Sequence, residues 1–266
     1  MARTIIVGDV HGCSGELARL LDKVRFSSGD RLVFVGDLVA RGPDSLGALD
    51  IARQTGAILV RGNHEHKLVT WYAARAAASP VGVPSREAER EPIGRMHRDV
   101  ARGLRPVDWT LLSTSPLHLD LPEHGARVVH AGVMPGVPFE EQDPQTLMRI
   151  RTVRVRGAGR GAEILWGRYY TGGPHVVFGH NAAPGLQLHP FATGLDTGCV
   201  YGGRLTAMVL EAGERIPRNV EARKALLVSQ AAARVYYDFE KAARSGMRSA
   251  ARDATRSAAR GTTKVA

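Results

Sequence analysis

The segment Thr4-Ile5-Ile6-Val7-Gly8-Asp9-Val10-His11-Gly12 opens the chain with a short, mostly apolar run that ends in glycine-flanked polar residues. Two later segments repeat this order: Leu32–Val35 before Gly36-Asp37, and Ala57–Val60 before Gly62-Asn63-His64. Short runs rich in Val and Ile, without alternation, are typical of buried strands. Helix-like stretches at Glu16–Val24 and Ser45–Thr55 separate them, so the sequence predicts a β-α-β-α-β order and an α/β layered fold.

The rest of the chain divides into a continuation of this domain and a C-terminal region. We expect a main domain over residues 1–212, interrupted by a helical insertion at 66–126 that lies over the site, and a C-terminal part over 213–266. The predicted helices are Lys67–Ala78, Ile93–Gly103, Val107–Thr114 and one from about Asn219 to Lys241; the predicted strands are Ala126–Val129, Val176–Phe178 and Leu205–Leu210. Ser79–Pro92 and Arg151–Gly161 are predicted loops, from their Pro and Gly content respectively.

Composition and charge narrow the class of protein. The 266 residues include only two cysteines, Cys13 and Cys199, and no apolar run near the roughly 18 residues that a membrane span needs. We therefore expect a soluble, cytoplasmic protein with no membrane contact. Residues 241–266 contain seven basic residues and one acidic residue, which is +6 of the net charge of +10. This basic tail is either a solvated helix or a contact for a polyanion.

Seven polar residues follow directly on predicted strands, next to glycines that let the backbone turn sharply. They are Asp9, His11, Asp37, Asn63, His64, His130 and His180. Imidazole, carboxylate and amide ligands suit a divalent transition metal. Six ligands are too many for one catalytic ion with open positions, so we expect two ions that share Asp37. Asp9, His11 and Asp37 would hold one ion, and Asp37, Asn63, His130 and His180 the other.

A pair of such ions favours phosphoester chemistry, because it holds phosphoryl oxygens and lowers the pKa of water. His64 is outside the ligand set and next to Asn63, so it is the candidate to protonate the leaving oxygen. A single Gly-Asp or His-Gly pair is common in turns, but five glycine-flanked blocks after strands are not explained in that way. The other histidines are expected in surface or packing positions: His66, His97, His118, His124, His175 and His189.

The five blocks resemble those of the calcineurin-like metallophosphoesterases and, more narrowly, of the phosphoprotein phosphatase superfamily. They are Gly8–Gly12, Gly36–Val39, Gly62–Glu65, His130–Gly132 and Gly179-His180, within a resemblance that spans about residues 4–211. It implies a central β-sandwich of two mixed sheets flanked by helices. It also implies a dinuclear centre, with Mn²⁺ as the first candidate and Fe, Zn, Co or Ni as alternatives, and hydrolysis of phosphoesters or phosphoanhydrides by a metal-activated water.

Two stretches of sequence indicate which branch of the superfamily this chain resembles. Protein-serine/threonine phosphatases carry Asp-Arg-Gly where this chain has Ala40-Arg41-Gly42, so His64 lacks the aspartate that pairs with their catalytic histidine. The stretches Val39–Ser45 and Leu195–Thr206 instead resemble the bacterial symmetrical bis(5'-nucleosyl)-tetraphosphatases and their shorter relatives. Those enzymes split diadenosine tetraphosphate into two ADP. A phosphoanhydride has a good leaving group and needs less help from a general acid, which also favours nucleotide polyphosphates over phosphoproteins.

The resemblance also assigns roles to single residues. Arg41 would bind the transferred phosphate, and Arg168 would be a second phosphate contact, because Trp166-Gly167-Arg168 resembles the Trp-x-Arg segment of small phage-type phosphatases. Tyr201 is a candidate to line the substrate pocket, and His64 would be the general acid. Other substrates on the same fold remain open: phosphoprotein, inorganic polyphosphate or capped RNA. A non-catalytic, anion-binding module is the alternative from another class, although every ligand position is filled.

Overall fold

Two five-stranded mixed sheets form the centre of the molecule, as a computed structural model shows for residues 2–77, 93–154 and 162–238. The first sheet has the order β12-β11-β1-β2-β3. Strands β1, β2 and β3 are parallel to one another, and β11 is antiparallel to both of its neighbours, β1 and β12. Its strands are β1 (Thr4–Val7), β2 (Arg31–Phe34), β3 (Ile58–Leu59), β11 (Arg204–Leu210) and β12 (Leu227–Ala231). The predicted β-α-β-α-β order is thus confirmed, because α1 and α2 connect the three parallel strands.

The second sheet has the order β4-β5-β8-β10-β9, in which β5, β8 and β10 are parallel and the two edge strands antiparallel. Its strands are β4 (His118–Leu121), β5 (Ala126–Val129), β8 (His175–Phe178), β9 (Gln187–Leu188) and β10 (Ala192–Gly194). A small hairpin of β6 (Thr152–Arg154) and β7 (Glu163–Leu165) stands apart from both sheets. The fold class implied by the family resemblance, a sandwich of two mixed sheets with helices, is confirmed.

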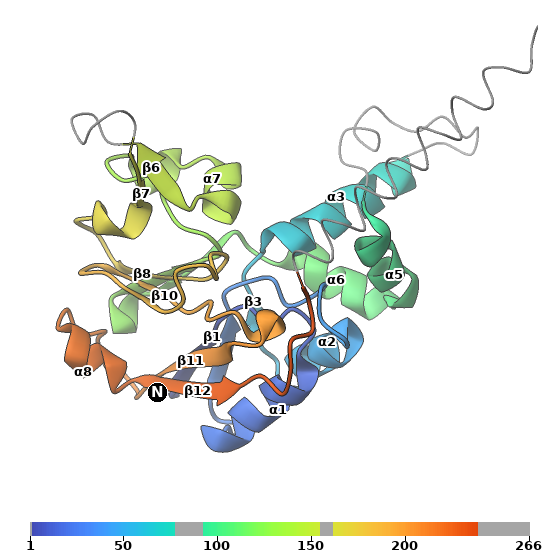
Figure 1. The fold of residues 1–266 in the computed structure, drawn as a ribbon, viewed down its shortest axis with the longest axis horizontal. Helices are drawn as coiled ribbons and strands as arrows, with labels where there is room; N and C mark the ends of the chain where they lie inside the picture. The colour runs from blue at the N-terminus through green and yellow to red at the C-terminus, as the bar shows by residue number, and fades with distance from the viewer. Residues whose placement is uncertain (1, 78–92, 155–161, 239–266) are drawn as a thin grey trace, which may run out of the picture.

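Three apolar clusters hold the layers together. One contains Ile6 and Val33 of the first sheet with Val128 and Val177 of the second, so it fills the space between the sheets. A larger cluster packs the other face of the first sheet against α1 and α2, and Figure 1 shows α1 on that side. A third lies on the outer face of the second sheet, around Trp166. Because β1 is buried along its whole length, its sequence shows no alternation of polar and apolar residues.

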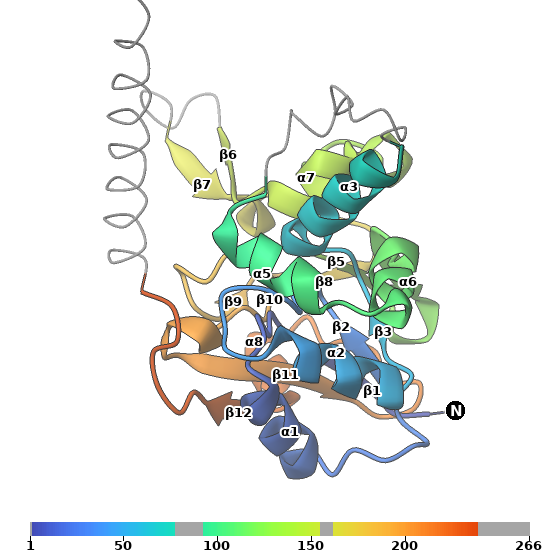
Figure 2. The same ribbon diagram turned by 90° about the vertical axis from the view of Figure 1, so that its right-hand side faces the viewer.

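The helices are α1 (Ser14–Lys23), α2 (Ser45–Gln54), α3 (Asn63–Ala77), α5 (Arg95–Gly103), α6 (Pro106–Thr114), α7 (Pro144–Arg149) and α8 (Val220–Lys224). Helices α3, α5 and α6 confirm that the insertion is largely helical, and Figure 2 shows α3 and α5 on the same side of the molecule as α2. Its last part is a strand, β4, which the sequence did not predict; β4 forms because it pairs antiparallel with β5. The predicted loop Ser79–Pro92 lies outside the described residues. No described helix meets the length and hydropathy of a membrane span.

Two predictions about the later chain are wrong. The helix expected from Asn219 to Lys241 is only the five-residue α8, after which Leu227–Ala231 forms β12 along β11. The unpaired backbone groups of β11 need a partner strand, and this need overrides the helix propensity of the segment. The loop expected at Arg151–Gly161 begins with a strand, because Thr152–Arg154 pairs with β7, and its residues 155–161 lie outside the described residues. The basic tail at 241–266 lies outside the described residues.

Candidate metal centre

Loops that follow β1, β2, β3, β5 and β8 bring the predicted polar residues to one place. Two groups of side chains each offer three ligand atoms within 4.8 Å of one another: His11, Asp37 and His64, and Asp37, His130 and His180. Asp37 belongs to both groups, which is the arrangement expected of a carboxylate shared by two ions. All five side chains are buried or half-buried.

Asp9 and Asn63 lie at the same cluster. The Asp9 carboxylate accepts the backbone N–H of His180 at 3.1 Å and lies 4.0 Å from His11 Nε2. Asn63 is the first residue of α3, and its Oδ1 is 3.1 Å from His130 Nε2. The structure therefore brings all six predicted metal ligands together.

The backbone of these loops is shaped for close approach. A Cβ on Gly36 would lie 2.5 Å from His130 Nδ1, and one on Gly179 would lie 1.9 Å from Asp9 Oδ1. Within the described chain, five of the six non-glycine residues with a positive φ lie in the site: His11, Asp37, Ala40, Arg41 and His180. Such conformations are strained by roughly 1–3 kcal/mol each and concentrate at functional sites.

Backbone carbonyls fix the orientation of two imidazoles. His11 Nδ1 lies 3.2 Å from the carbonyl of Val39, and His130 Nδ1 lies 3.1 Å from that of Val35. Because a carbonyl only accepts, each Nδ1 carries the proton and donates it. The lone pair of each Nε2 then faces Asp37, at 3.6 Å for His11 and 3.4 Å for His130. This is the orientation that metal-binding histidines require.

The donor set around His130 fits a divalent cation. With its proton on Nδ1, the ring aims the Nε2 lone pair at two further acceptors, Asn63 Oδ1 and Asp37 Oδ1. Burial lowers the pKa of His130, but the Asp37 carboxylate opposes it and the pKa rises to about 9. A second proton or a bound cation would satisfy the three acceptors. Imidazole, carboxylate and amide donors suit a divalent transition metal.

The buried carboxylate of Glu65 supports this cluster, a role that was not predicted from the block Gly62–Glu65. It accepts four backbone N–H groups, from Asp37, Leu38, Val39 and Gly62, at 2.8–3.2 Å. Burial raises its pKa to about 7. Glu65 therefore joins the loop after β2 to the loop after β3.

Arg41 lies at the edge of the cluster. Its guanidinium Nη1 is 2.7 Å from His11 Nε2, and its Cζ lies 5.7 Å and 5.9 Å from the ring centres of Tyr201 and Tyr237. Tyr201 is thus beside the site, as predicted. Tyr237 comes from the C-terminal segment and was not predicted, because only the folded chain brings it there.

Two exposed arginines act electrostatically on histidines, and one of them is the predicted second phosphate contact. Arg168 is exposed, and its charge acts on His189, whose pKa is lowered chiefly by burial. Arg151, another exposed arginine, acts on His180, whose pKa burial lowers to about 3. The structure therefore places Arg151, which the sequence did not single out, within electrostatic reach of the cluster.

Helix α5 of the insertion reaches the site through two side chains. His97 Nε2 is 3.1 Å from His64 Nδ1, and the two rings are stacked with centres 4.9 Å apart. Met96 Sδ accepts the backbone N–H of Arg41 at 3.1 Å. His97, assigned by the sequence to a surface or packing role, is buried against the predicted general acid.

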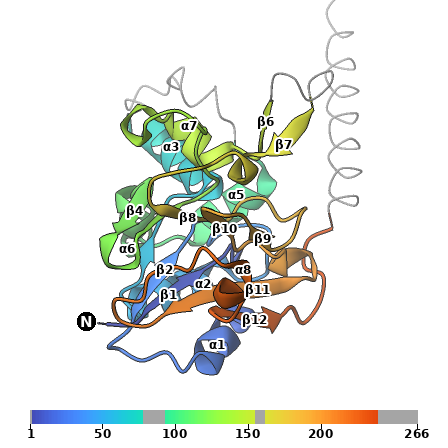
Figure 3. The same cartoon turned by 90° about the vertical axis from the view of Figure 1, so that its left-hand side faces the viewer.

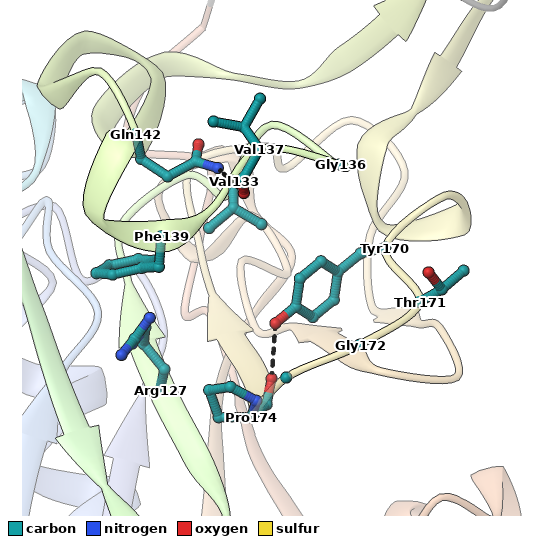
Figure 4. A pocket seen from close by; sticks show the side chains of 11 residues that line it. Arg127, Val133, Gly136, Val137, Phe139, Gln142, Tyr170, Thr171, Gly172 and Pro174 are labelled. Carbon is teal, nitrogen blue, oxygen red and sulfur yellow. Dashed lines mark hydrogen bonds between the residues drawn. The ribbon is translucent and has the colours of Figure 1, made fainter.

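A cavity of about 310 Å³ lies on the outer side of the second sheet and contains none of the predicted site residues (Figure 4). Three of its polar side chains already have partners. Arg127 pairs with Asp120, the Gln142 side chain binds three backbone groups, and the Tyr170 hydroxyl donates to the Pro174 carbonyl.

Comparison with known proteins agrees with this geometry. Two relatives named bis(5'-nucleosyl)-tetraphosphatase PrpE (asymmetrical) are similar over 76% of this chain. The one from Oceanobacillus iheyensis is 28% identical over 219 residues (86% of its length), and the one from Bacillus thuringiensis is 29% identical over 220 residues (88%). A crystal structure provisionally assigned to a diadenosine tetraphosphatase is 32% identical, with a TM-score of 0.69, over 87% of this chain and 94% of that one. The family model described as calcineurin-like phosphoesterase matches residues 2–211, so this chain belongs to the calcineurin-like phosphoesterase family.

Proposed function

We propose that this chain is a dinuclear-metal hydrolase that cleaves phosphoanhydride bonds of dinucleoside polyphosphates such as diadenosine tetraphosphate. The observation that carries the proposal is the buried cluster in which Asp37 is common to two groups of ligands, with Arg41 at its edge. Asp9, His11 and Asp37 would hold one ion, and Asp37, Asn63, His130 and His180 the second. When bound, such ions activate water and neutralise phosphoryl oxygens.

The remaining residues bind the substrate and move a proton. The Arg41 guanidinium binds the phosphoryl group to be transferred, because its planar donors match phosphate oxygens in pairs. His64 Nε2, which lies 3.9 Å from Asp37 Oδ2, delivers a proton to the leaving oxygen. Tyr201 contacts the nucleotide beside Arg41, and Arg168 is a second phosphate contact that would have to reach the site from its exposed position.

Two outcomes of cleavage are distinguished by their products. The stretches Val39–Ser45 and Leu195–Thr206 favour symmetrical cleavage to two ADP, whereas the relatives' name favours asymmetrical cleavage to ATP and AMP. We adopt the asymmetrical outcome, because the resemblance to those relatives extends over most of the chain and not over two stretches.

The test is product analysis by anion-exchange chromatography. Metal-free protein is loaded separately with Mn²⁺, Fe²⁺, Zn²⁺, Co²⁺ or Ni²⁺ and incubated with diadenosine tetraphosphate, with inorganic polyphosphate and with a phosphopeptide. ATP plus AMP in equal amounts is the expected result. ADP as the only product would support the proposed substrate but show that cleavage is symmetrical. Phosphate released from the peptide, with the dinucleotide intact, would overturn the proposal.

A further inference from the structure

The imidazole of His97 contacts the nitrogen of His64 that does not face Asp37. His64 Nδ1 is 3.1 Å from His97 Nε2, while His64 Nε2 lies 3.9 Å from Asp37 Oδ2. Both rings are buried, at 5% exposure each. The two nitrogens of His64 thus have separate surroundings: one faces the cluster and the other faces a single side chain of the insertion.

We propose that His97 is the positioning residue for His64, and this inference rests on the proposed role of His64 as proton donor. The imidazole torsion has a broad energy profile, so an unheld ring swings away from the productive angle. When His64 carries a proton on each nitrogen, its Nδ1–H donates to the lone pair of His97 Nε2. The Nε2 proton of His64 then passes to the leaving oxygen, and the neutral ring keeps its Nδ1–H bond to His97.

Helix α5, which carries His97, packs against the site, helix α2 and the large apolar cluster. Met96 accepts the N–H of Arg41 on one side of His97. At the end of α5, Gly103 packs so closely on Leu46 of α2 that an added Cβ would lie 2.9 Å from the Leu46 side chain. Val100 packs against the large apolar cluster. These contacts hold His97 in place without a direct bond from His97 to a metal ligand.

Other buried histidines show what a packing role looks like. His124 binds the Glu214 carbonyl and the Thr4 hydroxyl, and His175 binds the Thr193 hydroxyl, all outside the cluster. His97 differs because its partner is the predicted general acid. Ala40, at the position where the phosphatases carry the aspartate partner, has no side chain able to form a hydrogen bond.

The experiment compares leaving groups on the full-length, Mn²⁺-loaded protein. Phenyl phosphate has a poor leaving group and p-nitrophenyl phosphate a good one, so only the first depends strongly on proton donation. We expect His97→Ala to lower kcat for phenyl phosphate by about 10–100-fold and for p-nitrophenyl phosphate by less than about threefold, with KM little changed. His97→Gln, whose amide oxygen can still accept the bond, should recover most of the loss. Adding His97→Ala to His64→Ala should have no further effect, because the two act as a unit.

Val100→Ala is the matched control, since it loosens α5 without touching His64, and it should leave the ratio of the two rates unchanged. An equal loss on both substrates in His97→Ala, or a leaving-group ratio unchanged by His64→Ala, would overturn the inference. Failure of the unaltered protein to cleave diadenosine tetraphosphate would refute the proposed substrate instead, and the aryl phosphate ratio would still decide the role of His97.

Discussion

The ligand loops and helix α5 reach the same cluster by different means. The loops are held by the backbone: Gly36 allows close approach, Asp37 has a positive φ, and Glu65 binds four amides. Helix α5 is held by side chains, through Met96 and His97. The proposed ligands are thus positioned by main-chain contacts, whereas the partner of His64 is a side chain of the insertion. Each of the following variants changes one side of this comparison.

The largest effect is expected from Asp37→Asn, which removes the charge common to both ligand groups. We expect kcat/KM to fall by about a thousandfold or more, which corresponds to about 4 kcal/mol of transition-state stabilisation. Bound metal, measured by mass spectrometry after desalting, should fall as well. The exposed Asp22→Asn is the control and should keep activity and metal content. Full activity with two bound ions in Asp37→Asn would contradict the shared-carboxylate arrangement.

Arg41→Ala tests the substrate side of the ligand loops. A loss of about 100-fold in kcat/KM is expected, and Arg41→Lys should restore little, because an ammonium cannot bind two phosphate oxygens in a plane. Arg168→Ala is the comparison variant. Its exposed side chain should give a smaller loss than that of Arg41, and an equal loss would show that Arg168 reaches the phosphate during turnover.

Glu65→Gln tests how strongly the backbone of the loops is held. The glutamine keeps the shape of the side chain, but its NH₂ group faces some of the backbone N–H groups that now donate to Glu65. We expect the free energy of unfolding of the metal-free protein to fall by about 2–3 kcal/mol in urea titrations. Glu141→Gln, at an exposed position, should change it by less than about 0.5 kcal/mol. Equal stability of the two variants would show that the four amides are not a strong restraint.

Asp108→Asn tests the attachment of the insertion, and the smallest effect is expected here. The buried Asp108 side chain joins Arg105 of the insertion to Arg53 of α2. Its loss should lower stability by about 1 kcal/mol, and Asp99→Asn, which breaks exposed pairs with Arg95 and Arg102, by less than about 0.5 kcal/mol. Both are measured by urea unfolding at pH 7.

The same variant has a defined pH dependence. Burial raises the pKa of Asp108, but hydrogen bonds from Arg105 outweigh it and hold the pKa below its usual range. The folded pKa is therefore the lower one, so the stabilisation is complete well above about pH 4 and is lost as the pH falls below it. The difference between Asp108→Asn and the unaltered protein should shrink below pH 4. A constant difference down to pH 3 would contradict the assignment.

The ligand loops could be predicted from sequence because each combines a short apolar strand with a glycine-flanked ligand, as at Val7 to His11. All six ligand positions come together as expected. The contact between His97 and His64 could not be predicted, because no local pattern links residues 33 positions apart. The contact between Tyr237 and Arg41 could not be predicted for the same reason. The helix predicted over Leu227–Ala231 was wrong, because pairing with the edge of β11 decides the conformation there and outweighs the helix propensity of the segment.

Strand β12 has a consequence for how the chain can be shortened. It lies beyond the family match, yet it covers the outer edge of the seven-residue β11, as Figure 3 shows, and the Lys23 ammonium of α1 donates to the carbonyl of Ser229 within it. A protein cut at residue 211 would leave unpaired the backbone groups of β11 that face β12, and exposed strand edges recruit strands from other copies. Aggregation of such a truncated protein would reflect this exposed edge. The sheet extends to Ala231, and the chain beyond it still carries Tyr237 to Arg41, so a shortened protein needs both.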